Sequence, residues 1–130
     1  MSRLICLDRI LEMETEKGAR AVRNIPNTLT IFDSHFPRFP VLPGVLILGS
    51  LAELACRLLQ ERTGRAWRLG RAEQIRFRHF VGPGDQLDLR VELKEFSAEM
   101  ATFGASVRVG DKVVSTVRQL RLIPRETAGP

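Results

Sequence analysis

The sequence has little of what stabilises disulfide-bonded or metal-binding proteins. It contains two cysteines, Cys6 and Cys56, and two histidines, His35 and His79, in 130 residues. Two isolated cysteines are typical of reduced thiols and not of a disulfide framework. Two histidines far apart in the chain lack the spacing of metal ligands. We therefore predict no metal site and no cofactor.

Long apolar runs are also scarce. No run approaches the roughly 18 apolar residues of a membrane helix. Arg3, Asp8 and Arg9 interrupt the first ten positions, where a signal peptide would be apolar. These features predict a cytoplasmic protein that does not insert into a membrane.

Aromatic residues are few, with no tyrosine and one tryptophan. Because single-stranded nucleic acid binds by stacking its bases on aromatic side chains, this composition argues against a nucleic-acid partner. The net charge is +5. It predicts either attraction to an acidic protein partner or simply a basic, soluble surface.

The pattern of apolar residues predicts one α+β domain spanning residues 1–130. A helix is expected over residues 43–63, closed by Gly64. A hairpin precedes it, and residues 67–71 form a linker after it. Strands are expected at residues 4–15, 19–25, 73–80, 86–96, 100–109 and 113–123, followed by a flexible tail at 124–130. A single antiparallel sheet wrapped around the one helix accommodates these elements.

Residues 35–49, HFPRFPVLPGVLILG, form the most unusual stretch. Its X-Pro steps hold residues 35–42 in a stiff, extended conformation. Pro43 suits the first turn of a helix, and Gly44 allows a ligand or another backbone to approach the helix N-terminus. The next four residues are apolar on every face, which predicts a buried helix start. The stretch therefore places a histidine on a rigid loop beside a buried helix.

This stretch resembles the HFPGxPVxPGVLxxE signature of the 3-hydroxyacyl-acyl carrier protein dehydratases, of the FabZ type with FabA as a relative. Three further segments resemble that family: LDRIL at residues 7–11, AVRN at 21–24 and RFRHFVGPGDQ at 76–86. The resemblance spans about residues 7–123. It implies the hot-dog fold, a dimer joined edge to edge, and dehydration of thioesters carried by acyl carrier protein in fatty acid or polyketide biosynthesis.

The resemblance also implies roles for individual residues. His35 would be the base that removes the proton α to the thioester carbonyl, since neutral histidine suits that role near pH 7. The Gly44 N–H would donate to the enolate-like oxygen. Phe36, Pro43, Val45 and Gly49 are expected to contact substrate. Arg38, Arg76 and Arg78 are expected to bind the phosphopantetheine or the acidic carrier protein, unless they are simply solvated arginines.

Two positions depart from the family pattern. Arg38 stands where the family usually has glycine, and Gly49 stands where it has its catalytic acid. Glu53, one helical turn after Gly49, would then either act as the acid or pair with Arg57 at i+4.

A third possibility is a half-site or non-catalytic subunit. Sites in the resembled family combine the histidine of one protomer with the acid of the other. A related partner subunit in a heterodimer could therefore supply what Gly49 lacks, whereas a homodimer would depend on Glu53. A hot-dog thioesterase also needs an acid to activate water, so Gly49 argues against that activity equally.

Overall fold

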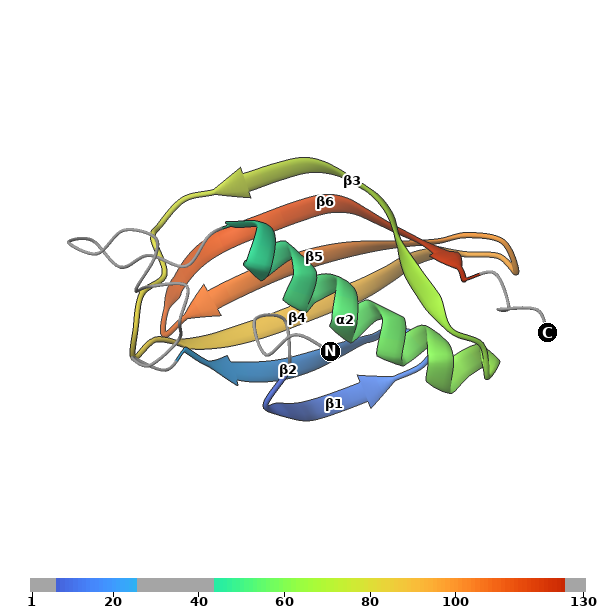
Figure 1. Cartoon of the computed structure of the whole chain (residues 1–130), viewed down its shortest axis with the longest axis horizontal. Coiled ribbons are helices and arrows are strands. Elements are labelled where there is room, and N and C mark those ends of the chain that lie inside the picture. The colour runs from blue at the N-terminus through green and yellow to red at the C-terminus, as the bar shows by residue number, and fades with distance from the viewer. Residues whose placement is uncertain (1–6, 26–43, 126–130) are drawn as a thin grey trace.

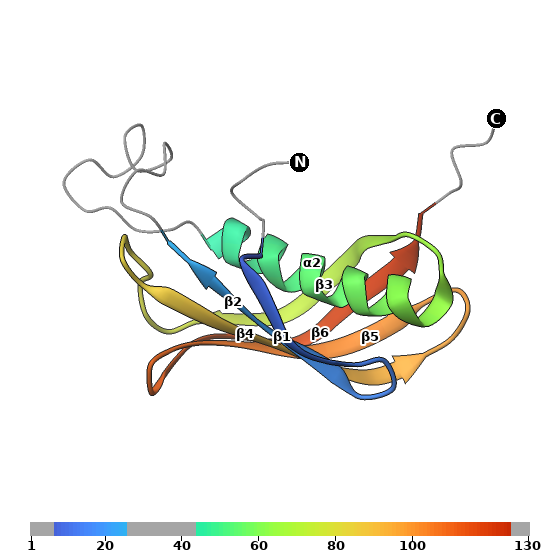
Figure 2. The same ribbon diagram turned by 90° about the horizontal axis from the view of Figure 1, so that it is seen from below.

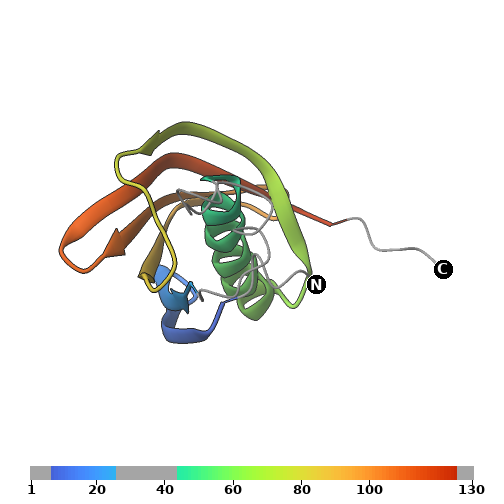
Figure 3. The same cartoon turned by 60° about the vertical axis from the view of Figure 1, so that its left-hand side comes forward.

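A long helix, α2 (Gly44–Thr63), lies across an antiparallel sheet (Figure 1). The computed structural model describes residues 7–25 and 44–125, and in this part of the chain the sheet has six strands in the order β1-β2-β4-β5-β6-β3. The strands are β1 (Arg9–Glu14), β2 (Gly18–Asn24), β3 (Trp67–Phe77), β4 (Gln86–Phe96), β5 (Ala101–Val109) and β6 (Lys112–Pro124). The sheet curves around the helix, which lies on its concave side (Figures 2 and 3). The predicted α+β hot-dog fold is confirmed.

The helix has one face toward the sheet and one toward solvent. Leu51, Leu54 and Leu58 are completely buried, while Arg57 and Glu61 are on the solvent side. The helix ends where the sequence predicts, because Gly64 adopts a left-handed φ of 74° and its N–H donates to the Gln60 carbonyl at 2.8 Å. Pro43, the predicted first residue, lies outside the described residues.

One expectation about the helix is wrong. The apolar run predicts that Val45 is buried, yet it is 71% exposed. The buried residues of the first two turns are Ile47 and Ser50, which place the sheet-facing side of the helix away from Val45. The start of α2 therefore presents an apolar side chain outward.

Side chains of the strands alternate between the core and the outer face. In β4, Leu87, Leu89 and Val91 are buried and Arg90 is exposed, as the alternation predicts. One core-facing row crosses all six strands through the paired positions Ile10, Ala21, Leu89, Val107, Ser115 and Phe77.

The boundaries of β3 differ from the prediction. Residues 67–71 are not a linker, because Trp67 pairs with Pro124 and Leu69 with Leu122 in β6. Trp67 is buried and its Nε1 donates to Thr63 Oγ1 at 2.9 Å, so the strand starts directly after the helix. It ends at Phe77 and not at residue 80.

The first and last strands in the chain also differ in length from the prediction. β1 begins at Arg9 within the described residues, and β6 extends to Pro124, so the predicted tail cannot start there. Residues 126–130 lie outside the described part. In the described ranges no helix has the length and apolar character needed to cross a membrane.

Candidate functional site

The N-terminus of α2 offers hydrogen-bond donors in an apolar setting. The first N–H groups of a helix have no partner within it, and the helix dipole favours negative charge there. Val45 projects from this end, and the ring of Phe77, at the end of β3, reaches Gly44. A Cβ atom added to Gly44 would lie 2.7 Å from Phe77 Cζ. Glycine at position 44 therefore lets the ring keep this place, beside N–H groups from which a carbonyl oxygen could accept.

Apart from Arg76 and Arg78, the predicted site residues fall into two groups. His35, Phe36, Arg38 and Pro43 lie outside the described residues, so their roles stay predictions. Gly44, Val45, Gly49 and Glu53 follow one another along the first half of α2. Gly49 is in the helix interior, one turn before Glu53, and no described contact explains the glycine there.

Glu53 makes the ion pair that the sequence allowed. Its Oε1 accepts from Arg57 Nε at 3.0 Å, and only 19% of the Glu53 side chain is exposed. The charge of this carboxylate also affects the neighbouring Cys56 thiol. Burial, and secondly the charge of Glu53, raise the pKa of the Cys56 thiol to about 11. The described contacts of Glu53 are therefore those of a structural helix pair.

A buried arginine supports the same part of the helix. Arg23 in β2 is only 2% exposed, and its Nη1 donates to Ser50 Oγ at 2.6 Å. Ser50 Oγ in turn donates to the Leu46 carbonyl at 3.1 Å. Buried arginines are rare, and this one ties β2 to the first two turns of α2. Alternation along β2 puts Arg23 on the same, core-facing side as Ala21. From the sequence alone, an arginine on that side looks like a break in the apolar pattern.

Arg76 and Arg78 do not join the helix N-terminus. Both are exposed, and Arg76 leaves β3 on the face opposite to Phe77, since successive side chains in a strand alternate. The paired positions Glu12, Arg20, Arg90, Ser106, Thr116 and Arg76 form one row across the outer face of all six strands. Arg76 and Arg78 line a hollow of about 420 Å³ together with Arg118. His79 is also exposed.

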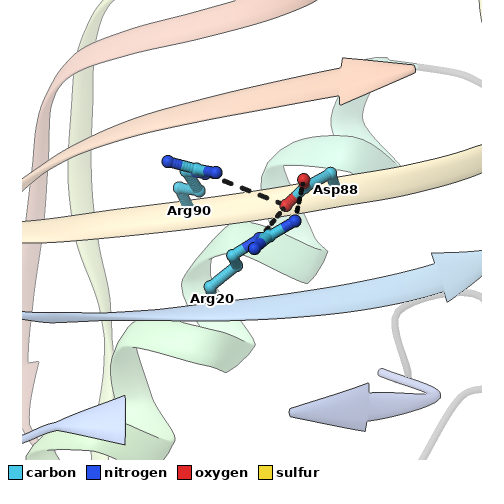
Figure 4. Close-up of polar contacts among 3 residues, drawn as sticks. All are labelled: Arg20, Asp88 and Arg90. Carbon is cyan, nitrogen blue, oxygen red and sulfur yellow. Dashed lines mark hydrogen bonds and ion pairs between the residues drawn. The ribbon is translucent and has the colours of Figure 1, made fainter. Parts of the chain in front are cut away.

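The same outer face carries a charge cluster that sequence reasoning missed. Arg20 donates to Asp88 through Nε at 2.9 Å and Nη2 at 2.8 Å, while Arg90 Nε lies 3.9 Å from the same carboxylate (Figure 4). The Asp88 carboxylate raises the pKa of Arg20 above its ordinary value. Arg20 and Arg90 line a second hollow of about 720 Å³. The pairing of Arg20 with Asp88 depends on the register of β2 against β4, which the sequence alone does not give.

The family model described as "ApeI-like: ApeI dehydratase" matches residues 11–118. The chain belongs to this dehydratase family. It is 32% identical over 133 residues to the 3-hydroxyacyl-[acyl-carrier-protein] dehydratase FabZ of Burkholderia cenocepacia, covering 98% of this chain and 86% of that protein. It is 35% identical over 113 residues to the FabZ of Levilactobacillus brevis, covering 85% of this chain and 76% of that one.

Solved structures share the fold. The chain matches a structure of the dehydratase heterocomplex ApeI:P from Xenorhabdus doucetiae with a TM-score of 0.78 and 12% identity, over 98% of this chain and 88% of that one. A point mutant of the fluoroacetyl-CoA thioesterase FlK, in complex with fluoroacetate, matches with a TM-score of 0.72 and 16% identity, over 87% of this chain and 90% of that one. At these identities the likeness establishes the hot-dog fold alone. Within the described residues no cluster of potential ligands could hold a metal ion.

Proposed function

We propose that this chain is a subunit of a dehydratase for 3-hydroxyacyl thioesters of acyl carrier protein, in fatty acid or polyketide biosynthesis. In this proposal the chain supplies His35 and the Gly44 N–H, and a related hot-dog subunit supplies the acid. The observation that carries it is the first half of α2. The helix N-terminus lies at Gly44, position 49 has no side chain, and Glu53 is paired with Arg57.

The reaction needs a base, an oxyanion donor and an acid. His35 would remove the proton from the carbon next to the thioester carbonyl, and the electron pair would move toward the carbonyl oxygen. The Gly44 N–H would stabilise the charge that develops on that oxygen. An acid would then protonate the 3-hydroxyl group, so that the C–O bond breaks and water leaves. Gly49 cannot supply that proton.

The sheet edges support a paired assembly. β3 is an edge of the six described strands and pairs there with β6. An edge strand presents unpaired N–H and C=O groups, which a strand of another chain can cover. The structural relative from Xenorhabdus doucetiae is described as a heterocomplex, which favours a related but different subunit as the cover. An acid-bearing partner would complete the site beside Gly49.

Glu53 favours a second candidate, a homodimeric dehydratase that needs no foreign subunit. Its carboxylate is one turn from Gly49, an axial distance of about 6 Å, and is mostly shielded from solvent. It would have to leave Arg57 to protonate a leaving hydroxyl directly or through a water molecule. Because of that requirement, we rank the homodimeric dehydratase below the paired subunit.

The decisive experiment measures hydration and dehydration of acyl carrier protein thioesters. The chain is assayed alone and after coexpression with a homologous dehydratase subunit that has an acid at the position equivalent to Gly49. We expect little activity alone, activity in the complex, and a loss of about 10²–10⁴-fold in the complex when His35→Asn is introduced. Gly49→Glu should raise the activity of the chain alone at least tenfold. Full activity of His35→Asn in the complex would refute the proposal.

A further inference from the structure

Phe77 occupies a fixed position at the start of α2. The three atoms of its ring nearest to a Cβ added at Gly44 are Cζ, Cε1 and Cε2, at 2.7, 2.9 and 3.0 Å. These atoms form the tip of the ring, so Phe77 points end-on at the first turn of the helix. It reaches from the end of β3 to the N-terminus of α2.

The backbone on both sides of Phe77 is anchored. The Arg76 carbonyl accepts from Ser115 Oγ at 3.0 Å, and the Arg78 N–H donates to the Val114 carbonyl at 2.8 Å. Phe77 itself pairs with the buried Ser115 on the core-facing row. Despite this anchoring, Phe77 is 52% exposed. A half-exposed aromatic ring on an anchored backbone therefore lies at the start of α2.

We propose that Phe77 is a substrate-contacting wall of the acyl site, packing against the first carbons of the acyl chain next to the thioester carbonyl. The inference rests on the proposed function, because it takes the Gly44 N–H as the donor to that carbonyl. A ring in contact with Gly44 shields this donor from water on one side, and a donor in a dry site stabilises developing charge more strongly. The occupant is apolar because Phe77 and Val45 are both apolar and exposed at this end of the helix.

The position of Phe77 predicts a particular substrate dependence. A wall beside the carbonyl touches atoms that every acyl thioester has, whether its chain is short or long. Truncating Phe77 should therefore reduce kcat/KM by about the same factor for a four-carbon and a ten-carbon substrate, about tenfold for a contact of this kind. A wall at the far end of the chain would instead affect only the long substrate.

The pairing of Phe77 with Gly44 is tested first by stability. Gly44→Ala should lower the melting temperature, because its methyl group meets the Phe77 ring, while Gly44→Ala with Phe77→Ala should recover part of that loss. The cycle is measured on the whole chain by thermal unfolding. Strictly additive losses would contradict the contact on which the inference is built.

The acyl site is tested by kinetics and binding, with the partner subunit present. Phe77→Ala and the milder Phe77→Leu are compared with Phe96→Ala, a matched control because Phe96 packs on Trp67 and Arg62 near the other end of α2. We expect equal losses on four- and ten-carbon thioesters for Phe77 variants only. Unchanged kcat/KM, or a loss that grows with chain length, would overturn the inference.

Binding separates this inference from the proposed function. The probes are four- and ten-carbon acyl-pantetheine amides, which cannot be turned over, titrated by calorimetry. Suppose the complex has no dehydratase activity but binds the amides, and binds them more weakly when it carries Phe77→Ala. That result would support Phe77 as a substrate contact and refute the proposed reaction. Absence of any binding to a wild-type complex that turns over the thioesters would overturn the wall and leave the proposed reaction standing.

Discussion

Replacing Glu53 with glutamine distinguishes a structural carboxylate from a catalytic one. In the structure Glu53 Oε1 and Arg57 Nε are 3.0 Å apart, and both residues lie on the same face of α2. We expect Glu53→Gln to reduce stability slightly and to leave turnover by the active complex within about twofold. The basis for this expectation is the energy of the contact that the variant loses.

The two roles differ in magnitude. An i,i+4 ion pair on a helix contributes about 0.3–0.5 kcal/mol, and partial exposure of Arg57 keeps this pair in that range. For a domain of this size the loss lowers the melting temperature by about 1–3 °C. A general acid contributes about 10²–10⁴-fold to rate, or about 2.7–5.5 kcal/mol. No ordinary surface pair reaches that value.

Arg57→Gln is the matched control, because it breaks the same ion pair from the other side. If Glu53 is structural, both variants lose similar stability and keep their activity. If Glu53 is the acid, only Glu53→Gln becomes inactive. A drop of a hundredfold or more in kcat for Glu53→Gln, with Arg57→Gln unaffected, would refute the paired-subunit reasoning and establish Glu53 as the acid.

Three further predictions concern reactivity and stability. Because burial raises the pKa of Cys56 to about 11, the folded protein in a Cys6→Ser background should react slowly with iodoacetamide at pH 8; fast alkylation would contradict it. The folded state also holds that proton longer than the unfolded state, so its contribution to stability is full below about pH 9 and is lost between pH 9 and 11, and Cys56→Ala should remove this dependence. Gln74 has a left-handed φ of 56°, so Gln74→Gly should raise the unfolding free energy by about 0.5 kcal/mol in urea titrations. Gln86→Gly in β4 should lower it, and a loss for both would show that Gln74 is not strained.

Local chemistry made most of the fold predictable. Gly64 after a long apolar helix and the alternation of Leu87, Leu89 and Val91 each follow from short-range rules, and both appear in the structure. The start of β3 does not follow from such rules. Trp67 begins a strand because it pairs with Pro124 and bonds to Thr63, and neither partner is deducible from the neighbouring sequence.

The candidate site was predictable only where its residues lie close together in the sequence, within one helix. Gly44, Gly49 and Glu53 could be placed on one helix from the sequence, and the structure keeps them there. Phe77 escaped because its relation to Gly44 joins an edge strand to a helix 33 positions earlier in the chain. The orientation of Arg76 relative to Phe77 follows from the alternation of strand side chains, and the register with β6 shows which of the two faces the core.

The two glycines of α2 have different physical explanations, and the difference bears on function. Glycine inside a helix costs about 1 kcal/mol relative to alanine. Gly44 is the first residue of α2, where that cost is smaller, and the ring of Phe77 explains the glycine because a Cβ there would displace the ring. At Gly49 no described contact does, although the position lies one turn before a carboxylate engaged with Arg57. If another subunit's acid lies beside Gly49, we expect Gly49→Ala to stabilise the chain, as alanine does inside a helix, but to lower the activity of the complex.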